Sequence, residues 1–393
     1  MIERAAAYIS LMEQDGDFMI TISLCMIVKN EEQVLERCLK SAAGVVDEII
    51  IVDTGSSDET KKIAAKYTDK IYDFTWEDDF SAARNEAFSH AEMDYCMWLD
   101  ADDIIPEQEQ EKIKRLKTEM EEDTSIVMMR YVMGFDKAGR PSLSYYRERL
   151  IKNHRGYCWR GRVHEAVALT GKIVYTDIEI EHRKMKEDAG GRTRNLMIYR
   201  KMKEENVPFT ARDLFYYGRE LYYLAMDSPE NLRESQEVLK KFLAHPDGWK
   251  ENKIEACRFL ALCCQVEGNE EGELTALLHS FFYDSPRAEL CCDIGAWFFK
   301  REKYQTAAFW YEMALKMKTD EKSGGFTCPD CSSYIPALQL AICSYRMGDI
   351  EQAEQWNELA LSFKPESESC RYNQIFFRGE REKDIANVCS IMI

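Results

Sequence analysis

The chain has 393 residues, of which 45% are hydrophobic, and its formal net charge is −18. This length indicates two or three domains, and the negative charge argues against nucleic acid as a partner. No apolar run is long enough to span a membrane. Because the 14 cysteines are scattered and no basic–apolar leader opens the chain, we predict a cytoplasmic protein.

The first half of the chain alternates short apolar runs with helix-like segments. Residues 1–18 are predicted to be an N-terminal extension, and a domain is predicted over residues 19–188. Buried strands are predicted at four apolar runs, residues 21–28, 45–52, 70–74 and 95–99. Strands that alternate with helices favour a mostly parallel sheet with right-handed crossovers.

Polar residues follow three of these strands directly. Asn30, Asp53 and Asp100 come just past strand ends, and Asp102 and Asp103 lie close behind Asp100. Because the carboxyl ends of parallel strands share one edge, these side chains are expected to converge there. Carboxylates this close repel one another unless a cation lies among them, and oxygen ligands suit Mg²⁺ or Mn²⁺ with substrate phosphates. The pattern predicts a nucleotide-sugar and divalent-metal site, with Asn30 also expected to cap the helix that follows.

A different pattern follows residue 121. Two β-hairpins are predicted, one with strands at 125–133 and 142–151 and one around residues 170–172. Segments 147–162 and 183–194 are basic, and His182 adjoins the second of them. Basic groups near a carboxylate site are what a diphosphate leaving group requires.

Helical periodicity dominates from about residue 192. Turn residues Gly268 and Glu302 are 34 residues apart, which is the tetratricopeptide period. We predict a stacked helical array over residues 189–368, with an insert at 318–333 and a tail at 369–393. The insert carries the pair Cys328 and Cys331, a CxxC that suits half a zinc site or a redox pair.

The first domain resembles glycosyltransferase family 2, of the GT-A fold. Four segments carry this resemblance in the family's order, residues 23–32, 51–60, 83–85 and 100–103. The chain is also similar to bacterial members with a tetratricopeptide C-terminal half, a group that includes peptide S-glycosyltransferases. The resemblance implies an α/β GT-A domain, a mostly parallel sheet with added hairpins, followed by an all-α tetratricopeptide-like array.

The resemblance also implies roles for individual residues. The residues expected to bind the nucleotide-sugar are Asn30, Glu31, Asp53, Arg84, Asp100 and Asp103. Among these, Asp53 corresponds to the carboxylate that reads uracil, and Asp100 to the one directed at the ribose. Asp102 corresponds to the metal ligand at the diphosphate.

Inverting transfer of a sugar also needs a base for the acceptor's proton. Glu165 is predicted to be this base, with His164 beside it, and His182 is assigned to the metal. The alternative makes His164 or His182 a metal or phosphate ligand. The predicted function is transfer of a hexose from a UDP-sugar, with Mn²⁺ or Mg²⁺, to a peptide or protein side chain, Cys or Ser.

Two alternatives stay open at this level. One is a glycosyltransferase acting on a cell-surface saccharide. The other is a tetratricopeptide binding scaffold whose transferase domain is degenerate. The helical array also offers a surface for a homodimer.

Overall fold

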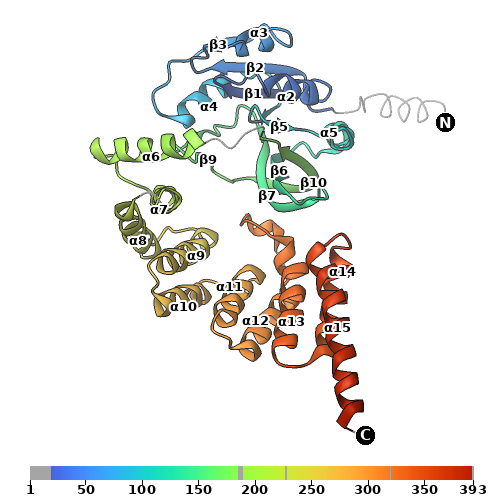
Figure 1. Ribbon diagram of the computed structural model, residues 1–393. Coiled ribbons are helices and arrows are strands. Elements are labelled where there is room, and N and C mark those ends of the chain that lie inside the picture. Colours follow the sequence, from blue (N-terminus) through green and yellow to red (C-terminus); the bar gives the residue numbers. More distant parts are fainter. Residues whose placement is uncertain (1–18, 185–188, 226–227, 319, 392–393) are drawn as a thin grey trace, which may run out of the picture. The chain divides into compact units, whose positions relative to one another are not determined.

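The computed structural model describes residues 19–184, 189–225, 228–318 and 320–391 (Figure 1). The predicted N-terminal extension, residues 1–18, lies outside the described residues. Two compact units divide the chain. The first unit comprises Met1–Phe135 and Ser144–Asn206, and the second comprises Asp136–Leu143 and Val207–Ile393.

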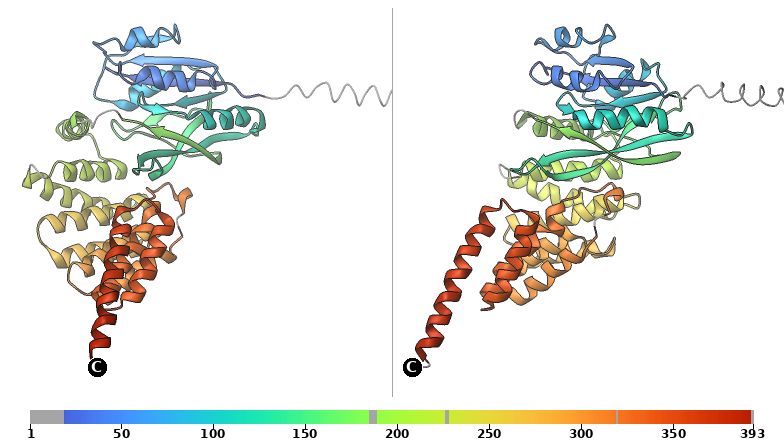
Figure 2. Two further views of the ribbon diagram at one scale, coloured as in Figure 1. Left: turned by 45° about the vertical axis from the view of Figure 1, so that its right-hand side comes forward. Right: turned by 90° about the vertical axis from the view of Figure 1, so that its right-hand side faces the viewer.

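The first unit is built around an eight-stranded sheet (Figures 1 and 2). In spatial order its strands are β3 (Ile71–Asp73), β2 (Glu48–Asp53), β1 (Ile22–Val28), β4 (Tyr95–Trp98), β7 (Pro141–Lys152), β6 (Thr124–Phe135), β10 (Lys172–His182) and β5 (Asp103–Ile104). Strands β3, β2, β1 and β4 are parallel, whereas β7 runs antiparallel to β4. The register sets Val28 opposite Asp53 and Cys25 opposite Trp98, so the ends of β1, β2 and β4 share one edge.

Helices cover both faces of this sheet, which explains why its central strands are apolar throughout. One core packs β1 against α2 (Leu35–Ala42) and α5 (Glu107–Glu119). A second core packs the other face against α4 (Phe80–Ser89). The short helix α3 (Thr60–Ala64) follows β2, and α6 (Ala189–Glu204) closes the unit. The predicted α/β class with a mostly parallel sheet is confirmed.

Two local predictions are wrong. Asn30 does not cap α2, because its backbone has φ +56° and its side chain accepts a hydrogen bond from Ser57 N instead. No hairpin forms around residues 170–172. Strand β9 (Ala166–Val167) pairs with β8 (Trp159–Arg160), whereas β10 crosses to run parallel to β6 and antiparallel to β5.

The second unit is an array of helix pairs, as the tetratricopeptide period predicts. The helices are α7 (Ala211–Tyr223), α8 (Pro229–Leu243), α9 (Lys250–Val266), α10 (Glu270–His279), α11 (Ala288–Phe299), α12 (Tyr304–Lys316), α13 (Tyr334–Arg346) and α14 (Ile350–Phe363). Each odd-numbered helix packs on the next one, and the pairs then stack. Helix α15 (Glu368–Ile391) occupies the predicted tail. The predicted tetratricopeptide-like region is confirmed.

Local chemistry explains several helix limits in this array. Thr210 and Asp213 form a reciprocal capping box at the start of α7, and Ser228 caps α8 ahead of Pro229. Gly218 lets α7 approach α8 closely, because a Cβ at this position would lie 2.7 Å from Leu239.

The predicted insert folds into two short 3₁₀ helices, η2 (Glu321–Ser323) and η3 (Pro329–Ser332).

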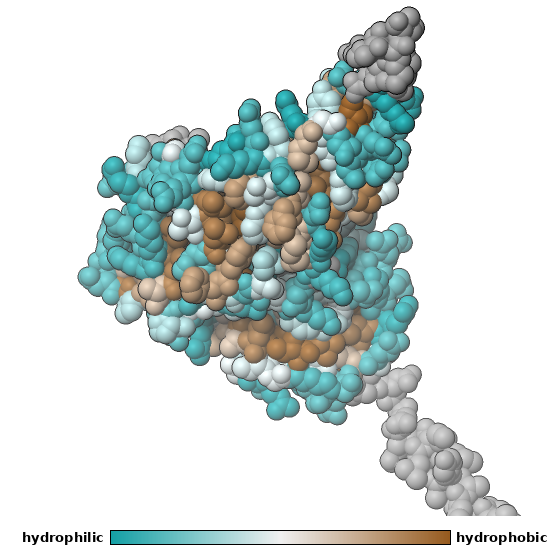
Figure 3. Space-filling view, turned by 90° about the horizontal axis from the view of Figure 1, so that it is seen from below, coloured by the Kyte–Doolittle hydropathy of each residue, from teal (hydrophilic) through white to brown (hydrophobic). Residues whose placement is uncertain are grey.

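The surface mixes polar and apolar areas. On the face shown in Figure 3, apolar side chains gather in patches between hydrophilic ones. A cavity of about 820 Å³ lies among α8, α9 and α10, and Leu243, Leu260 and Ala276 contribute to its lining. None of the helices among the described residues combines the length and apolar character that crossing a membrane requires.

Candidate active site

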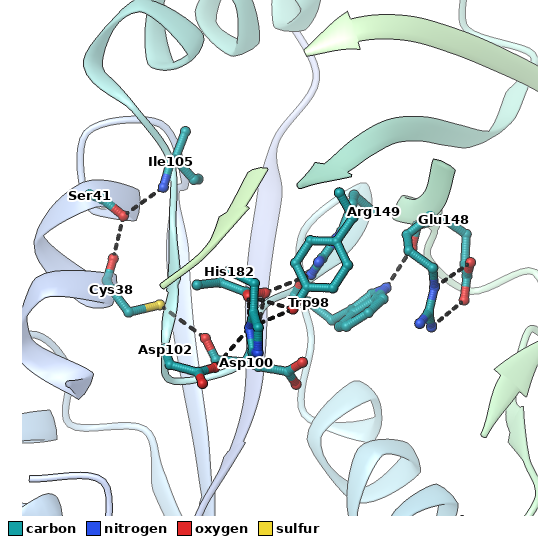
Figure 4. Close-up of polar contacts among 12 residues, drawn as sticks. Cys38, Ser41, Trp98, Asp100, Asp102, Ile105, Glu148, Arg149 and His182 are labelled. Atoms are coloured by element: carbon teal, nitrogen blue, oxygen red, sulfur yellow. Dashed lines mark hydrogen bonds and ion pairs between the residues drawn. The ribbon is translucent and has the colours of Figure 1, made fainter. Parts of the chain in front are cut away.

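The acidic segment after β4 folds back so that Asp103 is completely buried. Its carboxylate accepts hydrogen bonds from the backbone N of Asp100 at 3.0 Å, the Tyr131 hydroxyl at 2.7 Å and Arg149 Nη1 at 3.0 Å. The Arg149 guanidinium also lies over the Trp98 ring, 3.9 Å from its centroid (Figure 4). Because its oxygens are already engaged, the placement of Asp103 favours positioning the loop over contacting a nucleotide.

His182 lies between the two carboxylates that follow Asp100. Its Nδ1 is 3.2 Å from Asp102 Oδ1 and 3.1 Å from Asp103 Oδ1 (Figure 4). The pairing of β10 with β5 explains this contact, because it sets His182 opposite Asp103. A bond from Arg183 N to the Asp102 carbonyl, 2.9 Å long, fastens the same strand end to the loop.

This group is suited to a divalent cation. Ligand atoms of Asp102, Asp103 and His182 all lie within 4.8 Å of one another. Carboxylate oxygens and imidazole nitrogen are ligands that Mn²⁺ accepts, and metal binding requires the neutral imidazole. Asp102 is partly exposed, so Asp102 and His182 are the two residues that fit as ligands. Asp103 is fully buried and forms an ion pair with Arg149 instead.

The pKa of His182 leads to a stability prediction for metal-free protein. Burial alone would lower the pKa, but hydrogen bonds to Asp102 and Asp103 outweigh it and raise the pKa from 6.5 to about 9. A raised folded-state pKa stabilises fully below pH 6.5, and this contribution is lost as the pH rises through 9. We expect a loss on the order of 2 kcal/mol across that window.

The measurement is urea unfolding in EDTA at several pH values, for wild type and for His182→Gln. The difference in free energy of unfolding between the two proteins should shrink as the pH rises from 6.5 to 9. A difference that stays constant over this window would mean that the imidazolium is not what Asp102 and Asp103 hold.

Asp53 ends β2 with one oxygen satisfied and the other unpaired. Its Oδ1 accepts bonds from Gly55 N at 3.0 Å and Ser56 N at 2.8 Å. Gly55 has φ +103°, a backbone conformation that favours glycine and closes this turn. Asp53 Oδ2 is buried and has no hydrogen-bond partner within the described part of the chain. An unpaired buried acceptor is costly, so this oxygen suits a donor supplied by a ligand.

Asn30 and Glu31 tie the loop after β1 to the loop after β2. Asn30 N donates to Ser56 Oγ at 2.9 Å, and Asn30 Oδ1 accepts from Ser57 N at 2.8 Å. The backbone N of Glu31 donates to Thr60 Oγ1 at 2.7 Å. These two residues therefore border the turn that holds Asp53.

Arg84 joins the two sides of the site. Its Nη2 lies 2.9 Å from Asp100 Oδ1, and its Nε lies 2.6 Å from Glu165 Oε1. The buried guanidinium also packs over the rings of Trp98 and Trp159, with centroids at 4.7 and 5.1 Å. Because two tryptophan rings and two carboxylates already contact the guanidinium, its placement favours orienting both carboxylates over contacting the nucleotide-sugar directly.

Asn85 anchors the segment that carries Glu165 on the helix that carries Arg84. Asn85 Nδ2 donates to the Trp159 carbonyl at 3.0 Å and Asn85 Oδ1 accepts from Trp159 N at 2.8 Å, which anchors β8 on α4. His164 adjoins Glu165 in a backbone conformation with φ +53°. The side chain of Glu165 is 11% exposed, so one edge remains open to an incoming group.

Sequence reasoning missed several residues that support this site. Tyr131 and Arg149 orient Asp103, and the Cys38 thiol donates to the Asp100 carbonyl at 3.4 Å. Tyr131 lies in an apolar strand run and Cys38 on an apolar helix face, so neither carried a local signal. Arg149 belongs to the basic segment 147–162, and only the fold shows that it is buried whereas Arg155 and Arg160 are exposed.

The first unit matches a known protein family. Residues 23–168 match the family described as glycosyl transferase family 2. The N-terminal domain belongs to glycosyl transferase family 2. The matched range contains every predicted site residue except His182. The predicted family 2 domain followed by a tetratricopeptide-like region is confirmed.

Several individual proteins are similar over part of the chain. Glycosyltransferase SunS of Bacillus subtilis is 24% identical over 70% of this chain and 65% of its own length. A TPR repeat-containing protein of Synechococcus elongatus is 48% identical over 23% of this chain and 22% of its own length. Neither alignment reaches two thirds of the relative. Among solved structures, S. aureus TarS 1-349 in complex with UDP-GlcNAc aligns over 65% of this chain and 90% of that one, with 14% identity and a TM-score of 0.38.

Proposed function

We propose that the protein transfers a hexose from a UDP-sugar, with inversion, to a Cys or Ser side chain of a peptide or protein. Membership of the N-terminal domain in family 2 supports the transfer class. The observation that carries the proposal is that Arg84 contacts both Asp100, which we assign to the donor, and Glu165, which we assign to the acceptor. Transfer requires donor and acceptor to meet in line, and a shared guanidinium holds both carboxylates for that geometry.

The donor half of the site suits a uridine diphosphate. The unpaired Asp53 Oδ2 is available to accept the imide N–H of the uracil ring, and the proposal assigns Asp100 to the ribose. Asp102 and His182 would hold Mn²⁺ or Mg²⁺, which when bound neutralises charge on the departing diphosphate. Asn30 and Glu31 keep the loops around the base in place.

The acceptor half rests on Glu165. The acceptor oxygen or sulfur forms a bond to the anomeric carbon while the bond from that carbon to the diphosphate oxygen breaks on the opposite face. Glu165 takes the proton that the acceptor loses, and Arg84 Nε fixes the carboxylate for this transfer. His164 precedes Glu165 in the chain, and the proposal assigns it to orienting the acceptor.

The nature of the acceptor is the finest part of the proposal. An array of stacked helices offers an extended surface of the kind that binds peptides, which is an argument from fold analogy. The similarity to SunS, a glycosyltransferase, extends over 70% of this chain and so beyond the family 2 domain. A cell-surface saccharide is the acceptor to test against the peptide.

The decisive test is release of UDP from a panel of UDP-hexoses, with Mn²⁺ or Mg²⁺ and with or without EDTA. Slow hydrolysis replaces transfer in this assay, so no acceptor needs to be known. Chelator-sensitive release from one sugar would identify the donor and support the proposal. No release, together with no calorimetric binding of UDP, would favour a binding scaffold with a degenerate transferase domain.

Replacing Asp53 by asparagine should weaken uridine and UDP binding about 30-fold, or about 2 kcal/mol. The amide retains an oxygen for the Gly55 and Ser56 backbone donors but turns an N–H toward the imide N–H of uracil. Calorimetric titration with both ligands measures the effect. Asp73→Asn is the matched control, because Asp73 pairs with Asp53 in register but its side chain is 76% exposed. Equal affinities for wild type and Asp53→Asn would remove uracil recognition from this residue.

A further inference from the structure

The inserted segment between α12 and α13 contains a cysteine pair that the proposed transfer does not use. Cys328 and Cys331 flank the start of η3, and the backbone N of Cys331 donates to the Cys328 carbonyl at 2.9 Å. A bond between residues three apart closes a turn whose end Cα atoms lie within about 7 Å. Disulfides need Cα separations of roughly 4.4–6.8 Å, so this turn brings the two cysteines into bonding range.

The two cysteines also influence each other's ionisation. The neighbouring Cys331 thiol, together with burial, raises the pKa of Cys328 above its usual range. Both side chains are half-buried, and both cysteines are free. The raised pKa keeps the thiols protonated, so disulfide exchange at this turn must run through a small thiolate fraction and be slow at neutral pH.

The turn is anchored on α11, which keeps the pair in place. The backbone N of Cys328 donates to Glu289 Oε1 at 3.0 Å, and the Cys292 thiol donates to the Cys331 carbonyl at 3.3 Å. The Cys292 thiol also raises the pKa of the Cys331 thiol. Cys331 therefore has two neighbouring cysteines, Cys328 and Cys292, as candidate partners.

A metal centre is the competing use of these three cysteines. Among the described residues, the group formed by Asp102, Asp103 and His182 is the only one whose three ligand atoms lie within 4.8 Å of one another. The three thiols do not meet this criterion, and a structural zinc site needs four ligands at once. A disulfide needs only two sulfurs, and the closed turn supplies them.

We propose that Cys328 and Cys331 are a redox pair that a low-molecular-weight disulfide oxidises to an intrachain disulfide. One cysteine thiolate attacks the small disulfide, forms a mixed disulfide and releases one small thiolate. The second cysteine thiolate then attacks the protein sulfur of that mixed disulfide and releases the other. Two cysteine thiols lose two protons and two electrons in total, and the small disulfide becomes two small thiols.

The test uses the full chain, equilibrated in glutathione buffers of increasing oxidised fraction and then trapped with N-ethylmaleimide. Trypsin releases residues 323–346 as one peptide, which contains Cys328, Cys331 and Cys343. Mass spectrometry should find this peptide with one maleimide and one internal disulfide. The mixed disulfide with glutathione should stay below about one tenth of that species, because the second attack is intramolecular.

Three variants separate the outcomes. Cys328→Ser should abolish the internal disulfide and leave glutathione on Cys331, whereas Cys292→Ser should retain the internal disulfide. Cys158→Ser, which removes an exposed thiol of the first unit, is the matched control and should leave the peptide unchanged. A peptide with three maleimides in every buffer, a bond from Cys331 to Cys292, or one zinc per chain that Cys328→Ser removes would each overturn the proposal. The UDP-release assay does not depend on this result, so the two proposals fail separately.

Discussion

Asp102→Asn should lower UDP-sugar turnover by about a thousandfold or more, which corresponds to about 4 kcal/mol of lost transition-state stabilisation. Asparagine has nearly the same shape but lacks the charge that attracts a divalent cation. Of the two carboxylates that contact His182, Asp102 is the partly exposed one. The other, Asp103, is buried and also pairs with Arg149. The variant should fold, because asparagine keeps an oxygen acceptor for His182, and Asp103 still pairs with both His182 and Arg149.

Binding measurements can separate loss of the metal from loss of the nucleotide. In wild type, Mn²⁺ should strengthen binding of UDP but leave binding of uridine unchanged, because only UDP carries the diphosphate. In Asp102→Asn the Mn²⁺-dependent part should disappear, and uridine affinity should remain. The matched control is Asp69→Asn, at an exposed position of the same unit. Normal turnover by Asp102→Asn would contradict the assignment of the metal to this loop.

The second large effect is expected at Glu165. Glu165→Gln should lower the rate of the chemical step about 100- to 10,000-fold, the range that a general base contributes. Glutamine keeps the Oε1 acceptor for Arg84 Nε, so the buried guanidinium retains its partner and the fold is preserved. The affinity for UDP-sugar should change little, because the proposal assigns Glu165 to the acceptor rather than to the donor.

Single-turnover kinetics and calorimetry should be run together for this variant. Glu119→Gln, an exposed position on α5, is the matched control and should behave like wild type. If Glu165→Gln loses donor binding rather than the chemical step, Glu165 acts by holding Arg84 and Asp100, and another group takes the acceptor's proton. Unchanged turnover would remove Glu165 from the mechanism.

The order of elements and the edge of the site were determined by the sequence. Apolar runs of strand length, each followed by a polar residue, are enough to predict a parallel sheet with Asn30, Asp53 and Asp100 at one edge, since strand ends in such a sheet align. The family motifs and the 34-residue period are also local, so the two kinds of domain were predictable from the chain alone.

Only the tertiary structure decided which of the charged side chains act together. Arg84 reaches Glu165, 81 residues away, and His182 meets Asp103, 79 residues away, because β8 docks on α4 and β10 pairs with β5. The tertiary structure also shows that Asp103 is buried, whereas Asp102, the next residue, is partly exposed. Strand pairing and burial depend on contacts between distant segments, and a local pattern carries no information about them.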